Sequence, residues 1–343
     1  FEDRGGRSLT LRAEGTAPTC RAYLQHGLQR GPQPLKTYMI APMYRYDRPQ
    51  KGRYREHWQW SVEAIGSADP AVDAEIIQLY AEFLSRLGVR RYWLELNSIG
   101  DRECRPAYIE RLGAWLDEHE GELTAEAREK RATSPLRVFD VKDEPVRAAL
   151  AAAPKIGESL CDACRRHFAE VRGYLDAYGV PYRLVPTLVR GLDYYTRTTF
   201  EFVGEALGAK DVICGGGRYD GLVEEIGGAP TPGIGFGAGI ERLLLQLEEE
   251  GLEVAAPTGI DVFFAYEDGA PRGEVLRLMA MLRRAGRPCE TDYAGRSLKG
   301  QLTQAGRLGA ATIVIARNEG ATLRRRGEGD VELSYDELAG ALR

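Results

Sequence analysis

Residues 188–202 bring several chemically active side chains together. Arg190, Asp193, Tyr194 and Tyr195 fall within six positions, and a run of β-branched and aromatic residues follows them. The β-branched and aromatic residues in the second half of this stretch are typical of a strand. The charged and phenolic residues in the first half are not required by a strand. A fixed cation, a carboxylate and two phenols in one turn are typical of the lip of a small-molecule pocket. The alternative is a strand that begins with a polar turn.

A second dense segment, 44–56, holds four arginines and a lysine between two predicted strands. Loops on a rigid frame often carry function. The planar guanidinium fork suits phosphate oxygens, so Arg45 and Arg53 are candidates for a grip on polyphosphate. A solvated, charged hairpin is the alternative interpretation of this loop.

The strand that returns from this loop carries two more candidates, Gln59 and Glu63. Their spacing of four places them on one strand face, and we expect them to lie beside Trp58 and Trp60. A carboxylate and an amide that face inward beside indoles suggest a cationic ligand.

Two glycine-rich segments, 214–221 and 233–242, suggest close approach of the backbone to a flat ligand. Neither is a dinucleotide-binding fingerprint or a phosphate-binding P-loop. Alternating glycines in the second segment would leave one strand face bare as a slot for a planar base. Arg242, near the start of the following helix, would add positive potential for phosphate. For 214–221, a purely steric turn is the alternative.

Cys161 and Cys164 form a CxxC that is followed by His167. A zinc site would need further ligands, and the sequence has no second CxxC. We therefore interpret the pair as ordinary thiols on a helix. Six cysteines in 343 residues also exclude a disulfide scaffold and favour a reducing, cytoplasmic location.

The elements that must position these residues alternate at first between strand and helix. A short strand at 9–11 is expected to lead into a helix at 16–31, with Glu14 and Thr16 at the junction. Thr16 could simply cap that helix. The later elements expected before residue 104 are strands at 37–48, 58–65 and 92–96 and a helix at 71–87.

The rest of the chain divides by pattern into further parts. Residues 105–180 are expected to form a helical insertion between the two parts of one domain, 1–104 and 181–250. Residues 251–259 are expected to be a linker. The segment 260–343 alternates strands and helices, which predicts a separate α/β domain with a mostly parallel sheet. Its expected strands are 261–266, 289–292 and 311–316, and its expected helices are 270–285 and 297–308.

Composition narrows the class of protein. With 43% hydrophobic and 28% charged residues, the chain has the composition of a globular protein of two or three domains. It has no run of 18 apolar residues, so we expect no membrane span. The net charge of −5 argues against a broadly basic nucleic-acid surface, although it leaves room for a local RNA-binding patch.

Taken together, these segments resemble the class II aminoacyl-tRNA synthetases. Arg45 with its loop and Glu63 resemble motif 2 of that class, and 237–242 resembles motif 3. Within the class, 188–196 and 215–222 resemble the two signature peptides of the histidyl-tRNA synthetase family, bacterial type. The resemblance covers essentially the whole chain, and the signature peptides are highly specific.

Three departures from the family pattern remove no residue with an assigned role. Motif 1 is absent, and we expect it upstream, because the chain begins at Phe1 without a methionine. Ala13 stands where the family usually has proline. His57 and Trp58 replace the usual aromatic-histidine order before Gln59.

The resemblance implies an α/β fold, with an antiparallel sheet flanked by helices in an α+β catalytic domain, a helical insertion and a C-terminal anticodon-binding domain. It implies ATP-dependent ligation of L-histidine to tRNA(His) through a histidyl-adenylate. The enzyme would be a cytoplasmic homodimer that binds neither membranes nor DNA. No editing domain is required, because a site built from buried polar partners rejects analogues that lack the ring nitrogens.

The resemblance also implies roles for individual residues. Arg45 and Arg190 would contact the α-phosphate, and Arg53 and Arg242 the outer phosphates, with Mg²⁺ bridging them and no tightly bound metal on protein ligands. Glu63 and Tyr195 would bind the two imidazole nitrogens of histidine. Its ammonium group would be held by Glu14, Thr16 and Gln59. The remaining implied contacts are Tyr194, Gly216 and Tyr219 with histidine, and Gly237 and Gly239 with ATP.

Two other classes of protein share parts of this pattern. A catalytically inactive paralogue, such as the regulatory subunit of histidine biosynthesis, would be expected to lack Arg190 and the C-terminal domain, and both are present. Synthetases for glycine, threonine or proline have a similar C-terminal domain but should lack the peptide at 188–196.

Overall fold

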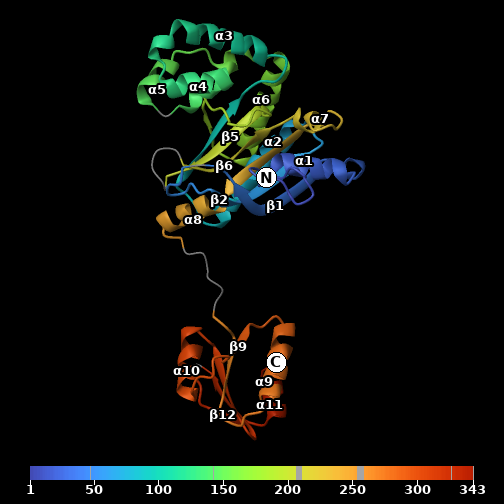
Figure 1. Cartoon of the computed structure of the whole chain (residues 1–343), viewed down its shortest axis with the longest axis vertical. Helices are drawn as coiled ribbons and strands as arrows, with labels where there is room; N and C mark the ends of the chain where they lie inside the picture. The colour runs from blue at the N-terminus through green and yellow to red at the C-terminus, as the bar shows by residue number, and fades with distance from the viewer. Residues whose placement is uncertain (47, 142, 206–210, 253–258, 326, 343) are drawn as a thin grey trace. The chain divides into compact units, whose positions relative to one another are not determined.

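The computed structural model describes residues 1–46, 48–141, 143–205, 211–252, 259–325 and 327–342 (Figure 1). The chain divides into two compact units, 1–253 and 254–343. Most of the predicted linker, residues 253–258, lies outside the described residues. No helix in the described part of the chain has both the length and the apolar character that crossing a bilayer requires.

The first unit is built on a seven-stranded sheet. Its strands are β1 (Leu35–Tyr44), β2 (Glu56–Ile65), β3 (Tyr92–Ser98), β4 (Arg183–Leu184), β5 (Thr196–Gly204), β6 (Asp211–Arg218) and β7 (Gly233–Gly239). They follow the order β1-β2-β7-β6-β5-β3-β4. All neighbours are antiparallel except β3 and β4, and β1 and β2 form the predicted hairpin. The large antiparallel sheet flanked by helices confirms the predicted fold class.

One face of this sheet carries the main hydrophobic core. It is covered by helices α2 (Pro70–Arg86), α6 (Asp162–Tyr178) and α8 (Ile240–Glu249). Helix α2 begins where the Asp69 side chain accepts a hydrogen bond from the backbone N of Ala71, with proline at the first helical position. In the core, the Tyr80 ring meets the rings of Phe202 and Phe236 edge to face. Each fully buried aromatic side chain of this kind contributes about 1.5–3 kcal/mol, which anchors α2 to the sheet.

The N-terminal segment differs from the sequence prediction in two ways. Residues 9–11 form no strand; Leu9 and Leu11 are 43% and 56% exposed, so this run has no apolar surface to pack on. The predicted helix at 16–31 is shorter, because α1 (Thr16–Gln25) stops before Gly27, whose φ of 64° breaks the helix. A 3₁₀ turn, η1 (Leu28–Arg30), follows. Helix α1 packs with α7 (Leu222–Glu225) on the other side of the sheet from the main core.

In the described residues of the region predicted as a helical insertion, the only regular elements are helices. The region contains α3 (Arg105–Glu118), α4 (Ala125–Thr133), α5 (Glu144–Leu150) and α6, with 3₁₀ turns η2 (Glu120–Glu122), η3 (Pro135–Asp140) and η4 (Ile156–Ser159). Helices α3, α4 and α5 gather at one end of the unit around a hydrophobic core of their own (Figure 1). Helix α6 belongs to both cores, since Cys164 lies in the small core whereas Val171 and Leu175 lie in the main one. This shared helix joins the insertion to the sheet.

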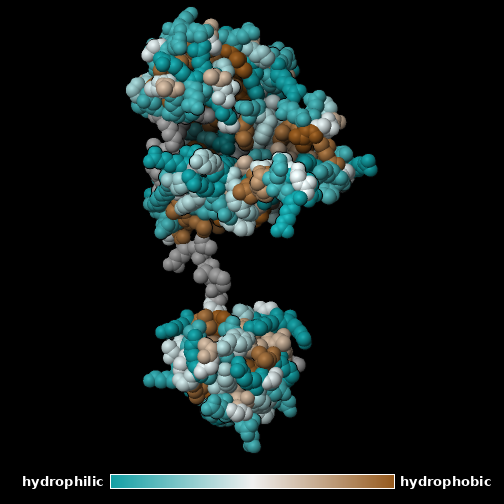
Figure 2. Space-filling model, in the orientation of Figure 1, coloured by the Kyte–Doolittle hydropathy of each residue, from teal (hydrophilic) through white to brown (hydrophobic). Residues whose placement is uncertain are grey.

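The second unit contains the predicted elements and three more. They are β8 (Val262–Tyr266), α9 (Arg272–Arg284), β9 (Cys289–Thr291), α10 (Leu298–Arg307), β10 (Thr312–Arg317), β11 (Gly320–Arg325), β12 (Val331–Leu333) and α11 (Tyr335–Ala341). The order is β12-β11-β10-β8-β9. The three predicted strands, β8, β9 and β10, pair in parallel as expected. The added strand β11 pairs antiparallel with both β10 and β12. Polar side chains dominate the visible surface of both units (Figure 2).

Candidate active site

A pocket of about 300 Å³ opens on the face of the first sheet opposite the main core. Its walls come from β2, β6 and β7, the loop after β1, the loop before β5, and the first residues of α1 and α8. The sequence-predicted residues that line it are Glu14, Thr16, Arg45, Arg53, Gln59, Arg190, Tyr194, Tyr195, Gly237, Gly239 and Arg242. Segments up to 228 positions apart in the chain, from Glu14 to Arg242, therefore meet in one place.

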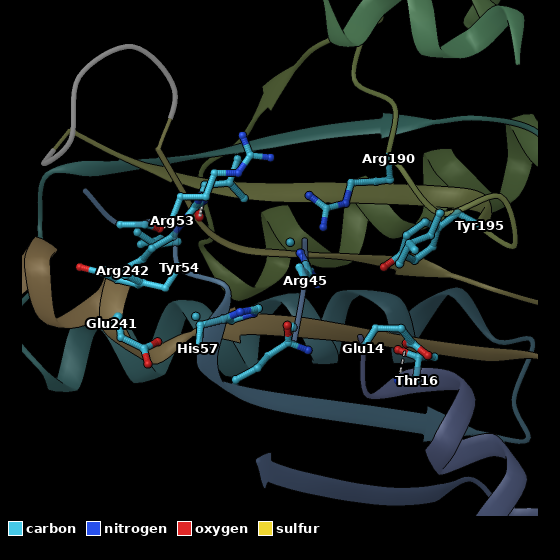
Figure 3. A pocket seen from close by; sticks show the side chains of 18 of the residues that line it. Glu14, Thr16, Arg45, Arg53, Tyr54, His57, Arg190, Tyr195, Glu241 and Arg242 are labelled. Carbon is cyan, nitrogen blue, oxygen red and sulfur yellow. Dashed lines mark hydrogen bonds between the residues drawn. The ribbon is translucent and has the colours of Figure 1, made fainter. Parts of the chain in front are cut away.

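The charged groups in this pocket are sorted by position (Figure 3). At one end lie Glu14, Thr16 and Tyr195. At the other end lie the guanidinium groups of two arginines with nearby aromatic and acidic side chains. The residues labelled there are Arg53, Arg242, Tyr54, His57 and Glu241. Arg45 and Arg190 lie between the two ends, so a cationic ligand group fits the first end and a polyphosphate the second.

The acidic end is formed at the start of α1. The Glu14 carboxylate accepts hydrogen bonds from the backbone N of Thr16 (2.6 Å) and of Ala17 (3.0 Å), and from the Tyr194 hydroxyl (3.3 Å). Glu14 therefore satisfies the helix end, and Thr16 is its first residue, not its cap. The Thr16 hydroxyl therefore does not cap the helix. It donates a hydrogen bond to Glu63 Oε1 at 2.7 Å.

Glu63 lies immediately beneath the pocket instead of lining it. Its side chain is almost wholly buried, and the Tyr219 hydroxyl donates to Oε2 at 2.6 Å. Burial raises the pKa of Glu63 to about 8, against the lowering effect of the Tyr219 and Thr16 hydrogen bonds. Gly235 makes room for it, because a Cβ there would lie 1.9 Å from Oε2. A buried carboxyl with a displaced pKa beside a pocket is typical of a functional site.

Strand β2 confirms one prediction and corrects another. Gln59 and Glu63 share a face, as their spacing predicted, and Gln59 lines the pocket. The indoles do not accompany them: Trp60 packs against Phe236 in the core on the opposite face, and Trp58 is 47% exposed. Successive side chains of a strand alternate between its faces, so residues at even and odd positions cannot share a site.

Gly215, Gly216 and Gly217 of the segment 214–221 lie within strand β6, so the alternative of a purely steric turn does not hold for them, and Gly221 precedes α7. Gly215 lines the pocket, and a Cβ on Gly217 would meet the Tyr195 ring at 2.9 Å. Gly216 faces the other way, since a Cβ there would meet Phe200 in the core at 2.7 Å. The structure thus places Gly215 in the pocket and not Gly216, because the strand alternation falls one residue from the predicted choice.

The Arg190 side chain is held over the glycines of strand β6. Its guanidinium lies over Gly215, where a Cβ would come within 2.4 Å of Nη1, and it forms an ion pair with Glu201 of β5. Burial opposes the positive charge, but the Glu201 carboxylate outweighs it and raises the pKa of Arg190. Nε has no hydrogen-bond partner among the described residues. The result is a preorganised, permanently charged cation at the middle of the pocket.

The other arginines connect the loop after β1 to the sheet and to the segment before α1. Arg242 Nε donates to the carbonyl oxygen of Gly52 at 2.8 Å, and Nη1 donates to that of Val212 at 2.7 Å. Arg45 Nε donates to the carbonyl oxygen of Ala13 at 3.1 Å. These contacts hold the arginine-rich loop over the pocket, so it is not only a solvated hairpin.

The pocket also contains residues that sequence reasoning missed. They are Gly52, Tyr54, His57, Leu192, Val212, Ile213, Gly215 and Glu241. Two of them carried a signal: His57 is two positions before Gln59 on the same strand face, and Glu241 lies inside the 237–242 motif. Burial and the neighbouring Arg45 lower the pKa of His57, which keeps the imidazole neutral.

Glu241 is a candidate metal or cation ligand at the arginine end. Its Oε1 accepts a hydrogen bond from the backbone N of Trp58 at 2.8 Å. Its Oε2 is buried and has no hydrogen-bond partner within the described parts of the chain. A buried carboxylate oxygen without a partner costs free energy unless a ligand satisfies it, so this atom fits a hard cation such as Mg²⁺.

Arg218 belongs to the glycine-rich segment 214–221 and Asp193 to the segment 188–196, but both lie outside the pocket. Arg218 is fully buried and forms an ion pair with the equally buried Asp73 of α2. It also donates to the carbonyl oxygen of Ser67 at 2.9 Å, so its role is structural. The Asp193 side chain is 77% exposed and its carboxylate lies 3.9 Å from Arg137.

Comparisons with known proteins show which proteins this chain resembles. The model of the family described as "Histidyl-tRNA synthetase" matches residues 1–243. The histidine--tRNA ligase of Anaeromyxobacter dehalogenans is 49% identical over 343 aligned residues, which cover 97% of this chain and 82% of the relative. That of Caldanaerobacter subterraneus subsp. tengcongensis is 46% identical over 319 residues, covering 93% and 76%. The crystal structure of apo S. aureus histidyl-tRNA synthetase superposes with a TM-score of 0.81 at 36% identity, covering 100% of this chain and 85% of that one.

Proposed function

The chain belongs to the histidyl-tRNA synthetase family, and from that premise we propose how it ligates L-histidine to tRNA(His) at the expense of ATP. In the first step a histidine carboxylate oxygen attacks the α-phosphorus of ATP, giving histidyl-adenylate and pyrophosphate. In the second step a terminal ribose hydroxyl of the tRNA takes the histidyl group and AMP leaves.

The observation that supports this assignment is the sorting of charge along the pocket (Figure 3). The carboxylate of Glu14 at one end suits the histidine ammonium group, and the arginine end suits the β- and γ-phosphates. Arg45 and Arg190 lie between them, where the carboxylate and the α-phosphate must meet. Such an arrangement catalyses by positioning the reactants and by stabilising the charge that develops on the phosphorus oxygens.

Histidine specificity is assigned to Glu63 and Tyr195. The carboxylate of Glu63 accepts from Thr16 and Tyr219 in the ligand-free structure. We assign the imidazole N–H to the oxygen now bonded to Thr16, which frees the Thr16 hydroxyl to turn, with Gln59, toward the substrate ammonium group. Tyr219 stays on the other oxygen and fixes its orientation, and the Tyr195 and Tyr194 rings form the adjacent wall.

ATP is assigned to the end formed by Arg53, Arg242, Gly237 and Gly239. The carboxylate of Glu241, with one unsatisfied oxygen, would hold Mg²⁺ there together with the phosphates. When bound, the ion neutralises phosphate charge and favours departure of pyrophosphate. The arginines of this chain orient the triphosphate so that its leaving group points away from the histidine end.

The division of labour along the chain follows from the two units. We assign adenylate formation to 1–104 and 181–250, with 105–180 as the insertion, and we assign anticodon recognition to 260–343, beyond the linker 251–259. The separate hydrophobic core of the second unit supports this division. We further propose a homodimer that acts in the cytoplasm.

Pyrophosphate exchange tests the assignment. Purified protein is incubated with ATP, labelled pyrophosphate and each of the twenty amino acids in turn. Incorporation of label into ATP is expected with histidine alone, and charging is expected with tRNA(His). Exchange with a different amino acid would refute the specificity. Absence of exchange, with the protein folded, would instead indicate an inactive paralogue.

A further inference from the structure

Four potential metal ligands meet where the helical insertion joins the sheet. Asp101 and Cys104 follow strand β3, and Cys161 and Cys164 stand at the start of α6. Each pair is separated by two residues, although 57 positions separate Cys104 from Cys161. One ligand atom from each of the four side chains lies within 4.8 Å of the others. The CxxC, which has no second CxxC in the sequence, thus acquires two more ligands by folding.

The separations suit a small tetrahedral site. Sγ of Cys104 lies 3.9 Å from Sγ of Cys164, and the Asp101 Oδ1 atom lies 3.6 Å from Sγ of Cys104 and 4.0 Å from Sγ of Cys161. Tetrahedral zinc with Zn–S bonds of about 2.3 Å requires sulfur atoms about 3.8 Å apart. All of these cysteines are free thiols, so no disulfide competes for them in this structure. All separations among the four ligand atoms are at most 4.8 Å, within about 1 Å of the tetrahedral spacing.

Two helix ends and one arginine bring positive charge close to the cluster. Cys104 and Cys161 are the N-cap residues of α3 and α6, so two positive helix ends point at the cluster. The backbone N of Asp101 donates to Sγ of Cys104 at 3.4 Å. Arg197 Nη2 lies 3.3 Å from Asp101 Oδ2, the carboxylate oxygen on the side away from the thiols. Burial and the Asp101 carboxylate raise the pKa of the Cys164 thiol, so a bound cation must displace this proton to form the thiolate that binds metal.

We propose that Asp101, Cys104, Cys161 and Cys164 bind one Zn²⁺ ion, through three thiolates and one carboxylate. The four protein ligands complete a tetrahedral shell, which is the mark of a structural site as opposed to a catalytic one. Binding displaces the three thiol protons to solvent. Cys104 and Cys164 are buried, whereas Cys161 and Asp101 are partly exposed and provide the route of entry.

The site would brace the peptide that carries Tyr195. Arg105, next to Cys104, donates from Nη2 to the carbonyl oxygen of Tyr195 at 2.6 Å. The backbone N of Arg197, a residue with φ of 50°, donates to the carbonyl oxygen of Gly100 at 2.7 Å. Two of the ligands, Cys104 and Asp101, are therefore direct chain neighbours of the residues that hold this peptide, Arg105 and Gly100. This positioning role rests on the proposed function, whereas metal binding itself does not.

Metal analysis of the intact chain tests the proposal. Protein produced with zinc in the medium, purified under reducing conditions and passed over a chelating resin, is expected to hold about one zinc per chain. Cys104→Ser and Cys164→Ser are each expected to reduce this to below about one-tenth. Cys289→Ser is the matched control, because that thiol is also buried but lies in the second unit, and it should retain the zinc.

So that the test does not depend on whether a variant folds, the metal site is also characterised in the wild-type protein. Replacement of the zinc by Co²⁺ is expected to give thiolate-to-cobalt charge transfer and the visible bands of a tetrahedral centre. X-ray absorption of the zinc form should show three sulfur ligands and one oxygen ligand. The proposal is overturned if the wild-type protein carries no zinc or cobalt, if Cys289→Ser loses the metal equally, or if peptide mapping finds a Cys104–Cys164 disulfide.

Separate readouts distinguish this inference from the assigned activity. If zinc-free protein still exchanges pyrophosphate at the wild-type rate, the metal contributes only to the stability of the fold. Zinc-loaded protein that lacks exchange with any amino acid would refute the proposed function while the metal site stands. If the protein binds zinc and also exchanges pyrophosphate with histidine, removal of the zinc is expected to raise the KM for histidine more than it lowers kcat. The reason is that loss of the metal would displace Tyr195.

Discussion

Replacement of Glu63 by glutamine gives the most direct test of how the histidine end is built. The folded protein holds this carboxyl almost wholly buried between Thr16 and Tyr219, with a pKa of about 8 where the usual value is 4.5. Glutamine keeps the size and an acceptor oxygen but cannot ionise. The change therefore isolates the free energy of folding that is lost when this buried carboxyl ionises.

The size and sign of the effect follow from linkage. Because the pKa of Glu63 is raised by folding, the folded state holds its proton where the unfolded state has lost it. Stability is therefore fully retained below about pH 4.5, falls as the pH rises, and levels off above about pH 8. At about 1.4 kcal/mol per pKa unit the loss is at most about 5 kcal/mol, and structural relaxation reduces it, so we expect about 2–5 kcal/mol. The Glu63→Gln variant should lack this loss.

Urea unfolding between pH 5 and pH 9 provides the assay. All four tryptophans lie in the first unit, so their fluorescence reports the unit that contains Glu63. The wild-type midpoint should fall with pH relative to that of Glu63→Gln, while the exposed Glu118→Gln should follow the wild type. Parallel curves for all three proteins would refute the argument. The same Glu63→Gln variant should raise the KM for histidine by about 10- to 100-fold, because the imidazole loses a charged partner.

Three further predictions concern the rest of the site. Arg190→Ala should slow single-turnover adenylate formation by about 10²–10³, with Arg190→Lys recovering only part of the rate and substrate affinities moving much less; an unchanged rate would make this arginine structural. Gly215→Ala should also slow that step, because its Cβ would lie 2.4 Å from the Arg190 guanidinium, whereas Gly113→Ala, with nothing within 4 Å, should not. A chain ending at residue 252 should still exchange pyrophosphate with histidine but fail to charge tRNA, since the two units have separate cores; a folded fragment without exchange would contradict this.

The fold was predictable wherever a local pattern was strong. Local patterns predicted β2, β3, α2, α9 and α10 close to their observed bounds, whereas the strand predicted at 37–48 ends at Tyr44 in β1. The failures have two different causes. Strands β11 and β12 are short and rich in charge, and Glu332 of β12 is held by Arg317 and Thr322, so no hydrophobic alternation marked them. Residues 9–11 had the alternation but no neighbouring surface to cover.

Within the site, the sequence by itself determined which side chains could do chemistry. The spacing of Gln59 and Glu63 placed both on one strand face, and the density of Arg190, Tyr194 and Tyr195 marked a pocket lip. Residue type and local period are written in the chain, so these inferences needed no fold.

Only the tertiary structure decided which of those side chains meet. It selected Gly215 in place of Gly216, because strand pairing fixes which face of β6 each residue takes. It joined Asp101 and Cys104 to the CxxC at 161–164, because the first residues of α3 and α6 pack together. Contacts across many positions depend on how packed elements dock, and a one-dimensional pattern carries no record of that docking.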